Sequence, residues 1–144
     1  MPTKEHTTPP ILWSDVFETG NADIDAQHRR LLTDSVRLQE MVETHAPWAE
    51  VLKSLDALVA DCTKHFRYEE EVLQATDFPR AQFHVARHRE IEAMLQDLHD
   101  IIVGLDGCNP ELRELVAAFE ARIIDIIVRH DLDYKSHLLN AVGR

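Results

Sequence analysis

Four long stretches of this sequence place apolar residues at helical spacing, and short breaks separate them. In the first stretch Ile24, Leu31 and Leu38 follow one another at intervals of seven positions, a spacing that lines one helix face. The four stretches span residues 23–44, 47–75, 79–102 and 110–141. Because long helices joined by short loops pack as antiparallel neighbours, we predict an all-α fold, an antiparallel up-down-up-down four-helix bundle.

The breaks between these stretches carry helix-start signals. Pro47, Pro79 and Pro110 each stand where a helix would open, and proline is well tolerated in the first helical turn. Asn109, directly before Pro110, is a suitable N-cap. The whole sequence contains only four glycines, which favours long helices over a turn-rich β fold.

The first 20 residues differ in character from the rest. They are polar, carry two adjacent prolines, and end in "ILWSDVFETG". We interpret residues 1–20 as an extended N-terminal arm that packs on the bundle through Ile11, Trp13 and Phe17. Residues 21–144 then form one four-helix domain, a reasonable size for a single hydrophobic core.

Composition excludes several classes of function. The formal net charge of −11 disfavours binding to nucleic acid or to an anionic membrane, because like charges repel. The apolar run "ARIIDIIV" is too short to cross a bilayer, and the N-terminus lacks the apolar region of a signal peptide. Two cysteines without a partner motif indicate a reduced, cytoplasmic protein.

Two pairs of metal-capable residues have the spacing of one helical turn. His65 and Glu69 are four positions apart, as are His84 and His88, so each pair shares a helix face. His84 and His88 alone could simply flank a solvated face, because charged residues lie beside them. Both, however, border the apolar stripe of their helix, and buried histidine or glutamate without partners is costly. Donors buried on several helices are typical of a metal site in a bundle.

The first and last helices offer further donors. His28 follows Ile24 by four positions and therefore faces inward, although alone it could be a hydrogen-bonded core histidine. Asp131 can supply a second carboxylate. We interpret Glu70 and Glu71, which neighbour Glu69, as solvated charges.

The segments "IDAQH", "HFRYEE", "FPRAQFHVARH" and "DLDYKSHL" resemble, in this order, the motifs of the hemerythrin family in its bacterial single-domain form. The resemblance implies a four-helix bundle that holds two carboxylate-bridged iron ions, with an oxo or hydroxo bridge, and binds dioxygen. It implies that His28 and His65 bind one iron and that His84 and His88 bind the other. Glu69 and Asp131 would bridge them. The donors themselves also accept zinc or manganese.

The sequence departs from the family pattern at one position. The family has a histidine five residues before the bridging aspartate, and this position is Ile126 if Asp131 is the bridge. If His130 were the family histidine, the bridge would fall on Lys135, which cannot bridge metals, so we favour the first register. His130 could still bind metal directly or through water, or be a hydrogen-bonded histidine at the edge of the core.

Three functions therefore stay open. The resemblance implies dioxygen carriage, storage or delivery, with no protein partner indicated. A site lacking one histidine would leave both irons more open, which favours a peroxidase or oxidase. A sensor of redox state or nitric oxide is the third alternative, although family members with that function are fused to signalling domains and this sequence contains none.

Overall fold

The computed structural model describes residues 18–105, 107 and 109–142, and among these it describes all side chains except those of 129–132 and 141–142. The predicted arm, residues 1–20, therefore lies almost entirely outside the described residues. The predicted contacts of Ile11, Trp13 and Phe17 with the bundle lie outside them as well.

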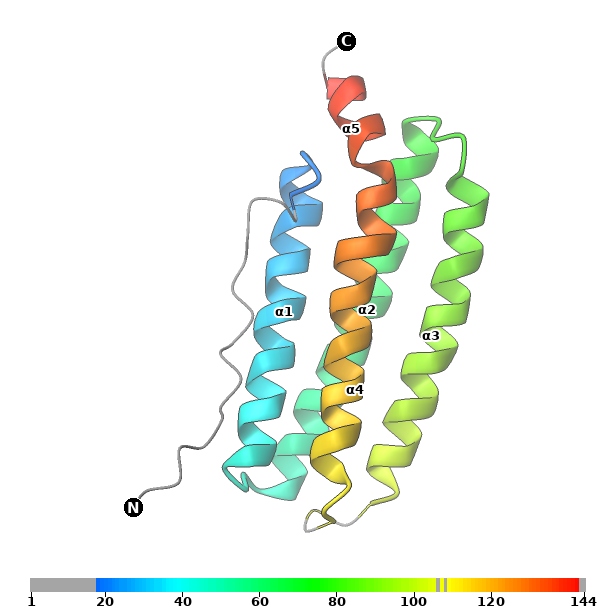
Figure 1. The fold of residues 1–144 in the computed structure, drawn as a ribbon. Coiled ribbons are helices and arrows are strands. Elements are labelled where there is room, and N and C mark those ends of the chain that lie inside the picture. Colours follow the sequence, from blue (N-terminus) through cyan, green and yellow to red (C-terminus); the bar gives the residue numbers. More distant parts are fainter. Residues whose placement is uncertain (1–17, 106, 108, 143–144) are drawn as a thin grey trace.

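The described chain is an all-α four-helix bundle, as predicted (Figure 1). Its helices are α1 (Ala22–Glu43), α2 (Trp48–Ala75), α3 (Ala81–Val103) and α4 (Leu112–Asp125), and a last helix, α5 (Lys135–Val142), prolongs α4. Consecutive helices run in opposite directions, and α4 packs on both α1 and α3, which closes the ring. In the described part of the chain no helix is long and apolar enough to cross a membrane.

Helix starts fall within two residues of their predicted positions. Asn21 caps α1, because its Oδ1 accepts hydrogen bonds from the backbone N–H groups of Asp23 and Ile24, both at 3.0 Å. The third and fourth helices start two residues after Pro79 and Pro110, at Ala81 and Leu112. Asn109 accepts a hydrogen bond from the N–H of Glu111 at 2.9 Å, so it caps the turn that precedes α4 rather than the helix itself.

The prediction of one regular helix from 110 to 141 is wrong. A π-helical turn at Ile126–His130 and a 3₁₀ turn at Asp131–Tyr134 separate α4 from α5, although the rod stays continuous (Figure 1). The π turn is wider than an α-helical turn, and the 3₁₀ turn is tighter. Together they change how far the chain is rotated about the helix axis and hardly change the direction of that axis. Apolar spacing could not reveal this, because the inward positions Phe119, Ile123 and Ile127 also fit a regular helix. Irregular turns of this kind often occur at functional sites.

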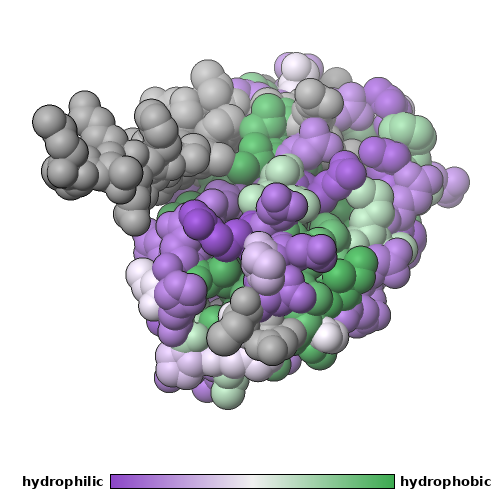
Figure 2. All heavy atoms as spheres, turned by 60° about the horizontal axis from the view of Figure 1, so that its bottom comes forward, coloured by the Kyte–Doolittle hydropathy of each residue, from purple (hydrophilic) through white to green (hydrophobic). Residues whose placement is uncertain are grey.

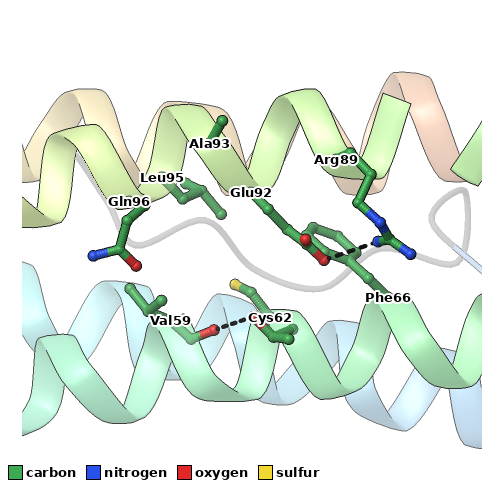
Figure 3. Close-up of a pocket in the computed structure, with 9 residues that line it drawn as sticks. Val59, Cys62, Phe66, Arg89, Glu92, Ala93, Leu95 and Gln96 are labelled. Atoms are coloured by element: carbon green, nitrogen blue, oxygen red, sulfur yellow. Dashed lines mark hydrogen bonds and ion pairs between the residues drawn. The ribbon is translucent and has the colours of Figure 1, made fainter. Parts of the chain in front are cut away.

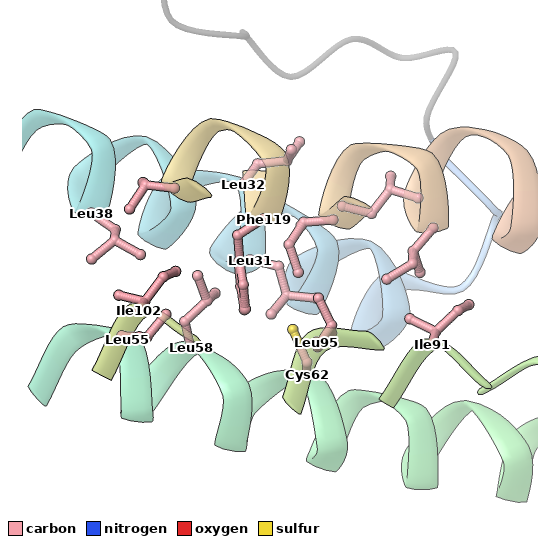
Figure 4. Close-up of a cluster of buried hydrophobic side chains, with 14 of the residues drawn as sticks. Leu31, Leu32, Leu38, Leu55, Leu58, Cys62, Ile91, Leu95, Ile102 and Phe119 are labelled. Carbon is pink, nitrogen blue, oxygen red and sulfur yellow. The ribbon is translucent and has the colours of Figure 1, made fainter. Parts of the chain in front are cut away.

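Two clusters of buried apolar side chains form the core. The larger cluster lies toward the α1–α2 and α3–α4 connections and includes Leu38, Leu55, Leu58 and Phe119 (Figure 4). The smaller one, at the other end, consists of Ile24, Leu73, Phe78, Tyr134 and Leu138. Along α1 and α2, residues 28, 65 and 69 lie between members of the two clusters. The fold thus holds a polar layer between two apolar layers.

The outer surface differs sharply from this core. Figure 2 looks toward the end of the bundle with the α1–α2 and α3–α4 connections, and hydrophilic side chains cover most of that face, with apolar ones interspersed. This distribution agrees with the high content of charged residues, 28% of the sequence.

Candidate metal centre

The polar layer is organised around the carboxylate of Glu69, which is fully buried on α2. Its Oε1 lies 2.7 Å from Nε2 of His84 and 3.1 Å from Nε2 of His88. Its Oε2 lies 3.0 Å from Nε2 of His65 and 3.9 Å from Nε2 of His28. Each oxygen of one carboxylate therefore faces its own pair of histidines.

Helix geometry accounts for this convergence. The spacing of four residues puts His65 and Glu69 on one face of α2, and His84 and His88 on one face of α3. His28 comes from the inward face of α1, and its Nε2 lies 3.1 Å from Nε2 of His65. All four imidazoles are 2% exposed or less. The site is therefore assembled from three helices and shielded from water.

The electrostatics favour an ionised Glu69. Burial by itself raises the pKa of this carboxyl group, but the hydrogen bonds with the four histidines outweigh burial and hold its pKa well below the usual range. A buried carboxylate surrounded by four imidazoles is costly as an ordinary core element. It is a suitable donor set for a cation, because the anion offsets positive charge while imidazole nitrogens supply lone pairs.

The five described donors fall into two groups that could each hold a metal ion. One group is His28, His65 and Glu69, and the other is Glu69, His84 and His88. Within each group the candidate ligand atoms all lie within 4.8 Å of one another, and every member is buried. Glu69 belongs to both groups, so the residues present fit two adjacent cations that share one carboxylate.

The structure thus brings together five of the six predicted ligands. The sixth, Asp131, lies outside the described side chains, as does His130. Ile126 is buried at 3% exposure and belongs to the larger apolar cluster. It also lines a small hollow with Ile91 and Met94 of α3. That Ile126 stands in place of a ligand histidine stays a prediction.

Three residues that contact the donors were not recognised from the sequence. The hydroxyl of Tyr134 donates a 2.6 Å hydrogen bond to Oε2 of Glu69. Oε1 of Gln27 lies 2.7 Å from Nδ1 of His65. The interpretation of Glu70 as a solvated charge is wrong, because Glu70 is 7% exposed and lies 3.4 Å from Nδ1 of His88.

These three contacts had different signals in the sequence. Gln27 is the neighbour of His28, and Tyr134 comes three residues after Asp131, so both could have been suspected from position alone. Glu70 could not, since a residue next to Glu69 should turn away from it. Its carboxylate is held by Arg67, three positions earlier on α2, and by Arg89 of α3, and the second of these contacts joins distant parts of the sequence.

A bundle that buries four histidines around one glutamate defines a class of cation-binding helical proteins. The family model for the hemerythrin HHE cation binding domain matches residues 19–137, and this chain belongs to that family. The match covers all four helices and every described donor. Family membership implies cation binding, which agrees with the two donor groups around Glu69.

Two curated relatives support this assignment. A bacteriohemerythrin of Ralstonia nicotianae is 29% identical over 90 residues, and a bacteriohemerythrin of Stenotrophomonas maltophilia is 23% identical over 107 residues. The alignments cover 62% and 74% of this chain, respectively. They span 62% of the length of the Ralstonia protein and 69% of that of the Stenotrophomonas protein.

Proposed function

We propose that this protein holds two iron ions on either side of Glu69 and binds dioxygen for carriage, storage or delivery. His28 and His65 would bind one ion, and His84 and His88 the other. Glu69 would bridge both ions, with Asp131 as the second bridge. The observation that carries the proposal is the placement of one histidine pair at each oxygen of a single buried carboxylate.

The chain's own residues suit this role. Two bridging carboxylates would offset the repulsion between the cations, and imidazole is a good ligand for iron. Tyr134 restrains the Glu69 carboxylate through its hydroxyl. The site is bounded toward the larger cluster by buried apolar side chains, among them Leu31, Leu32 and Ile127. These side chains keep water away from that side of the site. When bound, the ferrous pair would supply the electrons that dioxygen binding requires.

A second candidate function follows from the proposed substitution at Ile126. An apolar side chain buried at that position supplies no ligand, so the ion held by His84 and His88 would keep more open positions. A site open on both ions suits peroxidase or oxidase chemistry, or a response to redox state or nitric oxide.

One experiment tests the proposal and separates these functions. Metal-free protein is loaded with ferrous iron without oxygen, bound iron per chain is counted, and the visible spectrum is recorded in air and again after deoxygenation. We expect two irons per chain and a coloured form that reverts when oxygen is removed. Irreversible oxidation with turnover of a peroxidase dye would favour the second candidate, and failure to bind iron would overturn both.

A further inference from the structure

Two of the histidines also meet a neighbour through their second ring nitrogen, and these neighbours differ in charge. Nδ1 of His65 faces the neutral amide oxygen of Gln27 at 2.7 Å. Nδ1 of His88 faces a carboxylate oxygen of Glu70 at 3.4 Å. His65 and His88 are therefore similar as donors but differ in the charge of the group at their second ring nitrogen.

Glu70 is held in place by a network of charges that joins α2 to α3. Arg67 donates to its Oε2 at 2.9 Å, and Arg89 donates to its Oε1 at 2.7 Å. Both arginines also contact Glu92, at 2.9 and 3.3 Å. Two guanidinium groups, one at each carboxylate oxygen, favour the anionic form of Glu70.

The ring of His88 is also restrained by packing. Phe66 stacks on it with ring centroids 4.4 Å apart and an interplanar angle of 20°. Phe66, Arg89 and Glu92 together line a hollow of about 340 Å³ between α2 and α3 (Figure 3). The charged network thus meets the His88 half of the site through Glu70, and the hollow beside it meets the same ring through Phe66.

We propose that Glu70 is a positioning residue that makes the two metal sites unequal, so that the ion at His84 and His88 binds more tightly than the ion at His28 and His65. This inference rests on the proposed function. The negative charge of Glu70 acts on Nδ1 of His88 at 3.4 Å as an ion-pair contact and not as a hydrogen bond. This charge favours the tautomer that carries its proton on Nδ1, which leaves Nε2 free to bind metal and makes it more basic. The amide of Gln27 can select the same tautomer but has no net charge.

The test is an anaerobic titration of the metal-free full-length protein with ferrous iron, with free and bound metal separated by dialysis. Wild-type protein should bind two ions with unequal dissociation constants. Glu70→Gln keeps the shape and removes the charge, and we expect it to weaken the tighter ion by about 10- to 100-fold. The matched control is Glu71→Gln, which removes the same charge from an exposed neighbour on the same helix and should leave both constants unchanged.

Two variants that each lack one ligand histidine show which of the two ions Glu70→Gln affects. In His65→Ala the remaining ion is the one at His84 and His88, and adding Glu70→Gln should weaken it by the same factor. In His88→Ala the ring through which Glu70 acts is gone, so adding Glu70→Gln should not change the remaining ion. A merely structural role would instead lower the melting temperature of the metal-free protein equally in both backgrounds and leave the dissociation constants alone.

The outcomes separate this inference from the function on which it rests. If wild-type protein binds two ions and Glu70→Gln behaves like Glu71→Gln, the inference is wrong and the proposed function stands. If Glu70→Gln weakens the ion that remains in His88→Ala, the effect does not pass through His88 and the inference is again wrong. If wild-type protein binds no iron, the proposed function fails first.

Discussion

Two layers of this bundle use the same four-helix frame for opposite purposes. Toward the α1–α2 connection, the core packs aliphatic and aromatic side chains such as Leu38, Leu58 and Phe119. Each fully buried side chain of this kind contributes roughly 1.5–3 kcal/mol to the stability of the fold. Beyond this layer, three helices bury a carboxylate and four imidazoles. Stability and function are thus separated along the bundle axis.

The polar layer is the part that stability alone does not explain. Burying an uncompensated polar group costs about 2–7 kcal/mol, and an apolar layer of similar volume would avoid that cost. Here the groups compensate one another through Glu69, which contacts all four histidines. The difference between the two regions predicts that substitutions in one affect metal binding and substitutions in the other affect folding.

Glu69→Gln should have the largest effect on metal binding, because this residue belongs to both donor groups. We expect the affinity for both ions to fall by more than the ~10- to 100-fold that an outer partner contributes. Equilibrium dialysis against ferrous iron measures this loss. A variant that still binds two ions with wild-type affinity would contradict the central place of Glu69.

Leu58→Ala tests the apolar region. Leu58 is 1% exposed in the larger cluster, and truncation of such a leucine costs about 2–5 kcal/mol in the free energy of unfolding. Urea denaturation of metal-free protein measures this loss, while the number of ions bound by the folded variant should not change. If the variant stays folded but loses its metal, the two regions are coupled and the separation proposed above is wrong.

These two predictions depend on parts of the molecule that could be recognised in the sequence to different degrees. The four helices and the inward faces of His65, Glu69, His84 and His88 follow from spacing within single helices, a local property that a sequence displays directly. Contacts between helices are not local. The hydrogen bond from Tyr134 to Glu69 joins residues 65 positions apart, and the charged network on Glu70 depends on Arg89 of another helix.

The end of the α4 rod was the least predictable element. Apolar positions there fit a regular helix, yet the chain forms a π turn and then a 3₁₀ turn. The irregular turns shift residues from the positions they would have in a regular α-helix. The residues that are shifted depend on packing against the other three helices, and apolar periodicity does not record that packing. The roles of Asp131 and Ile126, both within these turns, therefore stay predictions.

Tyr134→Phe removes one hydroxyl from the polar layer and keeps the ring in the smaller apolar cluster. Since the hydroxyl donates to a buried, ionised carboxylate, its loss should lower the free energy of unfolding by about 1.5–3 kcal/mol. The only other tyrosine provides a matched control. Tyr68 donates to Asp23 near the surface at 3.0 Å, and Tyr68→Phe should cost less than about 1 kcal/mol in urea denaturation. Equal losses in the two variants would refute the special role of the buried hydroxyl.

The smallest effect should come from His99, on the surface of the apolar region. Burial lowers the pKa of His99, but its contacts with Asp56 and Asp100 outweigh burial and raise the pKa above its ordinary value of 6.5. The folded state therefore favours the cation. Its stabilising contribution is complete below about pH 6.5 and disappears as the pH rises through the raised pKa.

His99→Gln checks this pH dependence. Because Asp56 is well exposed, the loss of stability below pH 6 should be only a few tenths of a kcal/mol, about the value of a surface ion pair. The difference between variant and wild type should shrink at higher pH, and metal binding should not change at any pH. A difference that grows with pH would have the wrong sign for this explanation.

The most direct test of the central claim is the position of bound metal. Crystals grown with ferrous iron and measured at the iron absorption edge would show where the ions lie. We expect two anomalous peaks inside the bundle, one between Glu69 and the pair His28–His65, and one between Glu69 and the pair His84–His88. An interior without anomalous peaks at saturating iron, or peaks only on the surface, would contradict it.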